Sequence, residues 1–187
     1  MLDPRVARSR EAVLAAARDL LVESGPSAVT VDAVVARSGV AKSTIYRHWE
    51  SRDDLLVDVM KSSAPDLVPP PADASFADAV RNLVHQVGDM FADPEWARMV
   101  PALMMLKHHE DGLAHLEEEL HREQLDVLAD VMRRGVAEGR LDPAITPDEV
   151  AAQLIGPLFF ALLTDTITID RPFCDRVIDR FLTACTA

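Results

Sequence analysis

The segment from Gly39 to Trp49, GVAKSTIYRHW, concentrates side chains that donate hydrogen bonds or carry positive charge. In a helix of about 100° per residue, Ile45 and Trp49 share one face, and Val40 closes the turn before them. That apolar face must be buried, which places the polar side chains outwards or on the flanks: Lys42, Ser43, Thr44, Tyr46, Arg47 and His48. Phosphates and many base-edge atoms in a major groove accept hydrogen bonds. The segment therefore has the chemistry of a DNA-binding helix.

This segment is too short to fold alone, so the residues before it must support it. Residues Thr30 to Arg37 place apolar side chains at helical spacing, and the Thr30 oxygen can cap the helix start. Gly39 can adopt the left-handed conformation that ends such a helix. Two short helices joined by a tight turn with glycine make a helix-turn-helix. The alternative is a merely solvated helix, which is the commoner origin of an exposed polar face, and composition does not exclude it.

The order of the residues favours DNA binding. GVAKSTIYRHW, followed by ESRDDLL at residues 50–56, resembles the DNA-binding segment of the TetR family of bacterial transcriptional regulators. In that family a Gly-Val turn leads into Thr-aliphatic-Tyr-x-His-aromatic, and a basic residue precedes Leu-Leu. The resemblance covers roughly residues 8 to 62 and continues more weakly to the C-terminus.

The resemblance implies two sets of DNA contacts. Base edges are assigned to Lys42, Ser43, Thr44 and Arg47. Phosphates are assigned to Tyr46, His48, Thr30 and Arg52. Arg52 stands where the family usually has lysine, and Arg47 occupies a position that varies in the family.

The charge of the chain is unevenly distributed. The net charge is -12, yet residues 1–63 hold nine of the 19 basic and nine of the 31 acidic residues, which leaves ten basic and 22 acidic residues for the remainder. An acidic C-terminal part turned away from a polyanion would present the neutral N-terminal part to it. The N-terminal part is not strongly basic, so specificity would depend on a few placed contacts and a paired half-site.

Hydropathy and cysteine content indicate a cytoplasmic protein. The longest apolar run, about Leu158 to Leu163, is far below the ~18 residues of a membrane helix, and the first twenty residues are too charged for a signal peptide. Cys174 and Cys185 lie eleven apart in one predicted helix, about 16 Å, so they cannot pair within the chain. We expect a soluble protein without a membrane partner.

The pattern predicts an all-α fold of about nine helices in two parts. Residues 1–50 form the DNA-binding domain, residues 51–63 a connecting helix capped by Ser51, and residues 64–187 a regulatory and dimerisation domain. The Pro-rich stretch 64–75, APDLVPPPADAS, marks the boundary as a stiff connection. Beyond it, helices are predicted over 75–92, from 94 to about 106, over 111–138 and over 146–165, and from Pro172 onwards.

The last two predicted helices carry more apolar surface than one small domain can bury. A helix that is apolar around most of its circumference must be covered on all sides. The simplest closed arrangement is a two-fold dimer with a four-helix bundle, and the C-terminal sequence also resembles a TetR subgroup that dimerises in this way. The expected interface residues are Leu154, Leu158, Phe159, Leu162, Val177 and Phe181.

The C-terminal part offers candidates for a small-molecule site. Methionine-rich linings adapt to apolar ligands, and the candidates are Met90, Phe91, Trp96, Met99, Met104, Met105 and Phe159. Ordinary core is the alternative for each of them. His108, His109, His115 and His121 invite a metal interpretation, but exposed histidines are favoured, because Asp111 and Gly112 interrupt the helix between them. We expect no metal and no cofactor.

Together these patterns favour a ligand-responsive, sequence-specific DNA-binding regulator. By resemblance it would be a repressor that a small-molecule effector releases from a near-palindromic operator. A helical protein-interaction adaptor with a non-functional helix-turn-helix is the alternative, and it would show no salt-dependent duplex binding. No convergent nucleophile and base or paired carboxylates are recognisable, so we do not expect an enzyme.

Overall fold

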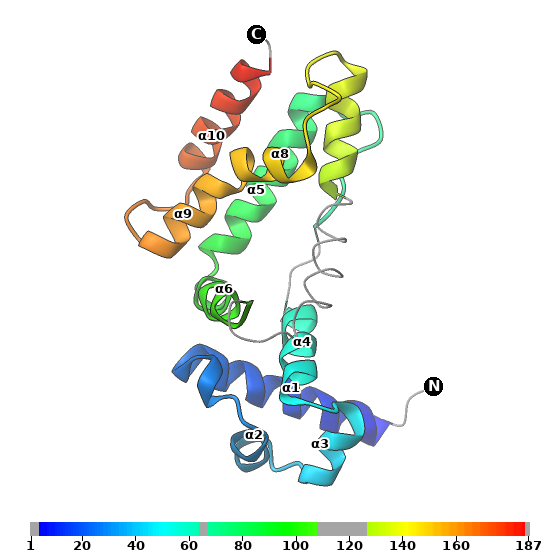
Figure 1. The fold of residues 1–187 in the computed structure, drawn as a ribbon, viewed down its shortest axis with the longest axis vertical. Coiled ribbons are helices and arrows are strands. Elements are labelled where there is room, and N and C mark those ends of the chain that lie inside the picture. The colour runs from blue at the N-terminus through cyan, green and yellow to red at the C-terminus, as the bar shows by residue number, and fades with distance from the viewer. Residues whose placement is uncertain (1–3, 64–66, 108–126, 186–187) are drawn as a thin grey trace. The chain divides into compact units, whose positions relative to one another are not determined.

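A computed structural model describes residues 4–63, 67–107 and 127–185 of the chain (Figure 1). Throughout these ranges the regular structure is helical and no strand occurs, so the all-α fold expected from the sequence is confirmed. No helix in the same ranges combines the length and the apolar character needed to cross a membrane.

The chain forms two compact units. The first contains α1 to α4 and the part of α6 that begins at Arg98, and the second contains residues 67–97 and 127–185. The Pro-rich stretch that the sequence marks as a domain boundary lies between α4 and α5. The domain limits expected from the sequence stay a prediction.

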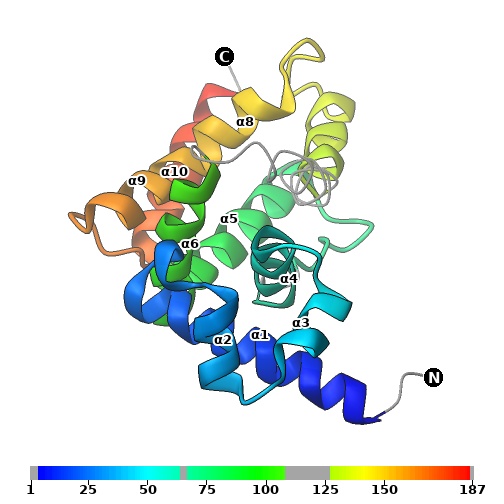
Figure 2. The same ribbon diagram turned by 60° about the horizontal axis from the view of Figure 1, so that its bottom comes forward.

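The first unit is a small helical bundle. Its elements are α1 (Pro4–Ser24), the 3-10 turn η1 (Pro26–Ala28), α2 (Val31–Ser38), α3 (Lys42–His48) and α4 (Arg52–Ser63). Figures 1 and 2 show α2 and α3 as short consecutive helices joined by a turn. Apolar residues of all four helices form the core: Val13, Ala17, Leu21, Val34, Ile45, Leu55, Leu56 and Val59.

Local hydrogen bonds set the helix ends of this unit, as the sequence predicts. The Thr30 hydroxyl accepts a hydrogen bond from the Ala33 N–H at 3.1 Å and caps α2. Gly39 ends α2 with φ 70°, in the left-handed region where glycine has no steric penalty. Ser51 and Asp54 cap the start of α4 reciprocally, because each backbone N–H donates to the side chain of the other residue.

The second unit contains the remaining helices. They are α5 (Phe76–Ala92), the start of α6 (Pro94–Lys107), a helical segment at residues 127–137, α8 (Pro147–Leu154), α9 (Gly156–Thr164) and α10 (Arg171–Ala184). Ser75 caps α5, and Thr146 with Glu149 forms the predicted capping box of α8. Gly139, at φ 66°, follows the helical segment 127–137, as predicted. The earlier part of the predicted helix 111–138 lies outside the described residues.

One predicted helix proves to be two. The sequence pattern suggested a continuous helix over 146–165, but α8 ends at Leu154 and α9 begins at Gly156. Pro157 explains the break, because it has no N–H to donate to the preceding turn and its ring clashes with the carbonyl four residues back. The expectation of a single helix was therefore wrong, and a proline inside the pattern was the signal for it.

Helices α5 and α10 pack closely along their length. Gly88 permits this approach, because a Cβ atom there would lie 2.5 Å from Cys174 Sγ. Three polar contacts run along the edge of this packing: the ion pairs of Arg81 with Asp179 and of Asp89 with Arg171, and a hydrogen bond between His85 and Asp175. Both cysteines are free, and burial raises the pKa of the Cys174 thiol.

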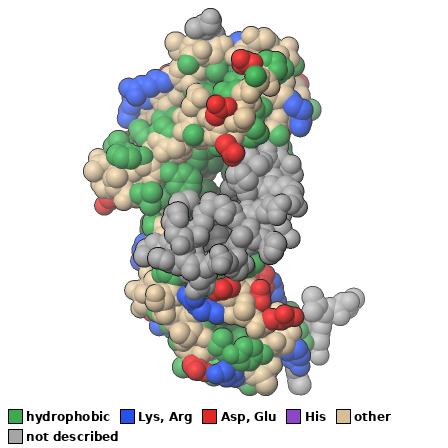
Figure 3. Space-filling view, viewed as in Figure 1, with side chains coloured by type: hydrophobic (Ala, Val, Ile, Leu, Met, Phe, Trp, Pro, Cys, Tyr) green, Lys and Arg blue, Asp and Glu red, His purple; other side chains and the backbone are tan. Residues whose placement is uncertain are grey.

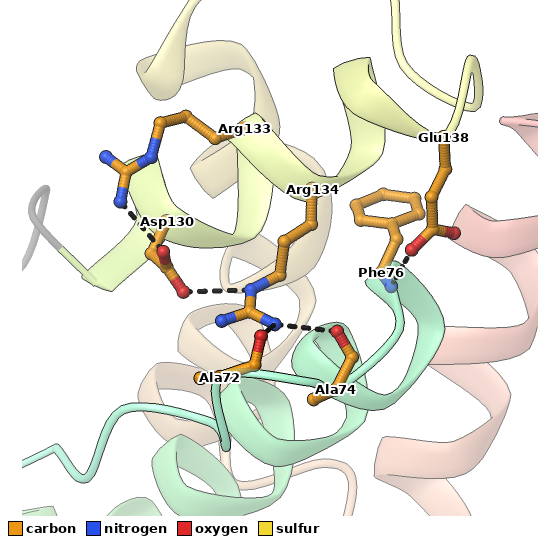
Figure 4. Close-up of polar contacts among 7 residues, drawn as sticks. All are labelled: Ala72, Ala74, Phe76, Asp130, Arg133, Arg134 and Glu138. Atoms are coloured by element: carbon orange, nitrogen blue, oxygen red, sulfur yellow. Dashed lines mark hydrogen bonds and ion pairs between the residues drawn. The ribbon is translucent and has the colours of Figure 1, made fainter.

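Within the second unit, side chains of the helical segment 127–137 and of the turn after it hold the end of the Pro-rich stretch and the start of α5 (Figure 4). Arg134 donates hydrogen bonds to the carbonyl oxygens of Ala72 at 3.3 Å and Ala74 at 2.6 Å. Glu138 accepts a hydrogen bond from the Phe76 N–H at 2.7 Å. Asp130 orients Arg134, and the hydrogen bond from that guanidinium lowers the pKa of the Asp130 carboxyl.

Candidate nucleic-acid interface

Helix α3 presents one buried and one exposed face, as its spacing predicts. Ile45 is 1% exposed and Trp49, directly after the helix, is 4% exposed. Tyr46 is 49% exposed, although it is a large aromatic residue. Lys42, Ser43 and Arg47 are also exposed, whereas Thr44 and His48 are half-buried. The helix therefore offers a row of hydrogen-bond donors on a face that the unit does not cover.

The first residue of this row already has an ionic partner. Lys42 Nζ lies 2.7 Å from an oxygen of Asp32, which stands in the first turn of α2. The hydrogen bond with this carboxylate raises the pKa of Lys42, so the ammonium stays charged. Both side chains are exposed, so solvent screens the pair and the ammonium can exchange Asp32 for a DNA acceptor.

Arg47 differs from Lys42 in this respect. Its side chain is exposed at the end of α3, and no ion pair holds it within the ranges that the structure describes. A guanidinium in such a position can donate two parallel hydrogen bonds to a guanine edge or to a phosphate.

Two of the expected phosphate contacts are restricted by their surroundings. The Thr30 oxygen accepts the capping bond of α2, which leaves its hydroxyl hydrogen to donate to a phosphate. The Nε2 atom of His48 is buried and has no hydrogen-bond partner among the described residues. A phosphate contact by His48 would therefore have to use Nδ1.

Arg52 has a structural role that the sequence did not suggest. Its Nε donates to the Val29 carbonyl at 2.8 Å, and its Nη2 donates to the Pro26 carbonyl at 2.6 Å. Two of the directions in which a guanidinium donates are thus used within the fold. These hydrogen bonds connect the start of α4 to the turn before α2, and the phosphate contact expected of Arg52 stays a prediction.

A second, partly buried polar contact joins the end of α3 to α4. Trp49 Nε1 donates to Asp58 Oδ2 at 2.8 Å, and Arg10 Nη2 donates to the same oxygen at 2.7 Å. The indole N–H of a buried tryptophan normally needs such an acceptor. Sequence reasoning missed Asp58, because nothing in the local pattern indicates which acceptor a buried indole meets nine residues later.

The candidate ligand residues are only partly brought together. Phe91 of α5 and Phe159 of α9 form an edge-to-face pair with ring centroids 4.8 Å apart. Met90 and Trp96 are half-buried, and Trp96 Nε1 finds no acceptor in the described part of the chain. Met99 is buried, whereas the side chains of Met104 and Met105, and the residues His108, His109, His115 and His121, lie outside the description.

Most of the residues expected at a dimer interface prove to be buried in their own protomer. Between 0% and 9% of their surface is exposed in Leu154, Leu158, Val177 and Phe181. Side chains enclosed by their own core leave little surface for a second chain, and the interface contacts expected of these four residues stay a prediction. Phe159 and Leu162 are half-buried.

The exposed apolar residues of this region lie on α9 and on the loop after it. Phe160 is 59% exposed, Leu163 54% and Ile167 40%. We call these three residues the α9 face. Hydrophobic side chains gather over α9 and its loop in the space-filling view (Figure 3). This surface needs cover that the protomer does not provide.

Comparison with known proteins agrees with this geometry. Residues 13–59 match the family described as "Bacterial regulatory proteins, tetR family", and residues 70–181 match "Tetracyclin repressor-like, C-terminal domain". The uncharacterized HTH-type transcriptional regulator YdeS of Bacillus subtilis is 30% identical over 171 residues, which cover 86% of this chain and 81% of that protein. The DNA-binding transcriptional repressor TetR of Mycobacteroides abscessus is 26% identical over 182 residues, covering 91% and 88% of the two chains.

Solved structures share the fold. The crystal structure of the transcriptional regulator FadR from Bacillus subtilis, in complex with stearoyl-CoA, superposes with a TM-score of 0.73 at 16% identity and covers 92% of this chain and 97% of that one. Because the family models match both parts of the chain, the classification does not depend on the helix-turn-helix alone. The chain belongs to the TetR family of DNA-binding bacterial transcriptional regulators.

Proposed function

We propose that this protein is a repressor that binds a near-palindromic operator as a homodimer and leaves it when a small molecule binds its C-terminal part. The observation that carries the proposal is the two-sided character of α3. One face is fixed in the core of the first unit, and the opposite face is a row of exposed donors. Such a helix can enter a major groove without unfolding its support.

We assign the DNA contacts in two groups. Lys42, Ser43, Thr44 and Arg47 read base edges, while Thr30, Tyr46 and His48 hold phosphates. The exposure of Lys42, Ser43, Tyr46 and Arg47 and the remaining hydroxyl hydrogen of Thr30 support these roles. Arg52 is left out of both groups, because its guanidinium bonds to backbone carbonyls.

We assign dimerisation to the α9 face, flanked by Phe159 and Leu162. The support is the exposure of Phe160, Leu163 and Ile167 in an otherwise well-buried helix bundle. An isologous contact buries the same patch of both copies and closes the assembly as a dimer. Two recognition helices at a fixed separation then select two half-sites one helical repeat or more apart.

An effector would act through the C-terminal part, which we assign to residues 64–187. FadR of Bacillus subtilis was crystallised with stearoyl-CoA, and the relative from Mycobacteroides abscessus is described as a repressor. In this chain, the buried Trp96 Nε1 is a donor that an effector with a hydrogen-bond acceptor would satisfy. Ligand binding would shift a population of states and change the half-site separation. The protein would act in the cytoplasm, where bacterial DNA lies.

The test begins with selection of duplexes from a random-sequence library by the full-length protein. Fluorescence polarisation with an enriched duplex and a random one, at several salt concentrations, then measures affinity and salt dependence. We expect tight binding to the enriched duplex and a fall in log K with log salt of about 0.9 per phosphate contacted. Absence of any salt-dependent duplex binding would leave the interaction adaptor as the better reading of the fold.

A further inference from the structure

Two polar contacts attach α4 to the two ends of the helix-turn-helix. The first, which we call the front latch, consists of Arg52 and the carbonyl oxygens of Pro26 and Val29, at 2.6 and 2.8 Å. Val29 immediately precedes Thr30, the N-cap of α2. The front latch therefore sets where α2 begins relative to the first residue of α4.

The second contact, the rear latch, consists of Asp58 with Trp49 and Arg10. Asp58 Oδ2 accepts from Trp49 Nε1 at 2.8 Å and from Arg10 Nη2 at 2.7 Å. Trp49 is the residue that ends α3, so its indole fixes the C-terminal end of the recognition helix. Asp58 lies six residues beyond Arg52, about 9 Å along α4, so the two latches hold the motif at separate points.

Packing alone would not define this geometry. Leu55, Leu56 and Val59 are at most 1% exposed and supply the apolar contact between α4 and its neighbours. Hydrophobic burial is non-directional, so it tolerates small rotations and shifts of one helix against another. Hydrogen bonds to a carboxylate and from a guanidinium are directional and charge-assisted, so they select one register.

We infer that Arg52 and Asp58 are positioning residues for operator recognition, which fix α2 and α3 to α4 and act on DNA binding only through the placement of these helices. The inference rests on the proposed function, because it concerns how the recognition helix is held. Helix α4 ends at Ser63, after which the chain continues towards the second unit. A displacement of α4 would therefore be transmitted to both helices of the motif together.

The direction in which one substitution changes DNA affinity distinguishes a positioning role from a simple electrostatic effect. Removal of an acidic side chain near the DNA-binding face should strengthen DNA binding by Coulomb's law alone. If Asp58 positions Trp49, Asp58→Ala should instead weaken operator binding. Glu50 is an exposed carboxylate directly after Trp49 and takes part in neither latch, so Glu50→Ala is the matched control for the charge change.

The experiment measures the ratio of affinities for the duplex enriched by the wild-type protein and for a random duplex of equal length. A partly unfolded sample lowers the active concentration for both duplexes equally, so the ratio reports the placement of α3 rather than stability. For Asp58→Ala we expect the ratio to fall about tenfold, the size of an effect from a lost charge-assisted hydrogen bond. Asp58→Asn should recover part of it, because the amide oxygen can still accept from Trp49.

Arg52→Lys is the second variant to be tested in this experiment. Lysine keeps the positive charge, so a residue that merely contacts phosphate would retain affinity, ratio and salt slope. A lysine cannot reproduce the two divergent bonds of the front latch, so we expect the ratio to fall about tenfold at an unchanged salt slope.

The outcomes distinguish a failure of the positioning role from a failure of the proposed DNA-binding function. If Asp58→Ala and Arg52→Lys keep the wild-type ratio, or if Asp58→Ala strengthens operator binding as Glu50→Ala does, the positioning role is wrong while the DNA-binding function stands. If the wild-type protein enriches no duplex and shows no salt-dependent binding, the proposed function itself fails.

Discussion

Replacing the two most exposed residues of the α9 face should separate the proposed homodimer into single chains. Burying a whole Leu or Phe side chain contributes about 1.5–3 kcal/mol. Phe160 is 59% and Leu163 54% exposed, so association can add about 1 kcal/mol per side chain. A two-fold dimer contains each of the two residues twice, so the four side chains contribute about 4 kcal/mol to the free energy of association. This corresponds to about three orders of magnitude in the dissociation constant. The double variant Phe160→Glu with Leu163→Glu loses this contribution and adds four mutually repelling carboxylates.

Sedimentation velocity at micromolar protein measures this directly. The wild-type protein should sediment at twice the 20.5 kDa of one chain, and the double variant at the mass of a single chain with an unchanged circular dichroism spectrum. Val68→Glu is the matched control, because Val68 is 63% exposed and lies outside the α9 face. A wild-type protein that sediments as a single chain, or a double variant that remains dimeric, would refute the assignment of the interface.

Three further predictions concern stability and electrostatics. Gly88→Ala places a Cβ atom 2.5 Å from Cys174 Sγ and should destabilise the fold by about 1–3 kcal/mol in thermal denaturation. Hydrogen bonds from Thr146, that of the backbone N–H first, lower the pKa of Glu149. The stability from this cap is present above about pH 4.3 and lost as the pH falls through the lowered folded pKa, so the urea midpoints of wild type and Glu149→Gln should differ above this pH and converge as the pH falls. Asp32→Asn removes the carboxylate that competes with DNA for Lys42 and one negative charge near the DNA-binding face, so the affinity for random DNA should rise.

Each of these three predictions would be contradicted by a specific outcome. Cys174→Ala in the Gly88→Ala background should restore much of the lost stability, and an unrelieved loss would mean that the contact between α5 and α10 is not its cause. A constant difference between wild type and Glu149→Gln across the acidic range would contradict the ionised cap. An unchanged affinity of Asp32→Asn for random DNA would show that this carboxylate does not compete with DNA for Lys42.

Local signals in the sequence were sufficient for most helix ends. Thr30, Ser51, Ser75 and Thr146 each cap the helix that follows, because a cap involves only residues within about one turn. The break between α8 and α9 had an equally local signal in Pro157. It was outweighed by the unbroken apolar pattern around it, which does not reveal a missing backbone donor.

The orientation of an apolar helix was less accessible from the sequence. Leu158 and Phe160 are both strongly apolar, yet the first is fully buried and the second mostly exposed. When almost every position of α9 is apolar, periodicity cannot tell which face meets the protomer's own core. Helix α10 is different, because its apolar residues, among them Val177 and Phe181, repeat at helical spacing and are buried. That spacing predicts a covered face, but it does not tell whether the cover comes from the same chain or from a second one.

The candidate site likewise combines features that follow from local sequence with contacts between residues that are distant in the sequence. The buried and exposed faces of α3 follow from the spacing of Ile45 and Trp49, because they depend only on helical geometry. The hydrogen bonds of Arg52 and Asp58 join residues from 9 to 48 positions apart, and they exist only once the bundle has formed. A charged residue next to a DNA-binding motif looks like a DNA contact in sequence, whereas its partners in the fold are carbonyl groups.

The most direct test of the central claim is a salt titration of duplex binding by the wild-type protein, Tyr46→Ala and Lys42→Ala. We expect Tyr46→Ala to weaken binding to the enriched and random duplexes alike, and Lys42→Ala to lower the preference for particular base pairs. If both variants bind the enriched duplex with wild-type affinity at every salt concentration, the exposed face of α3 is not the surface that binds DNA.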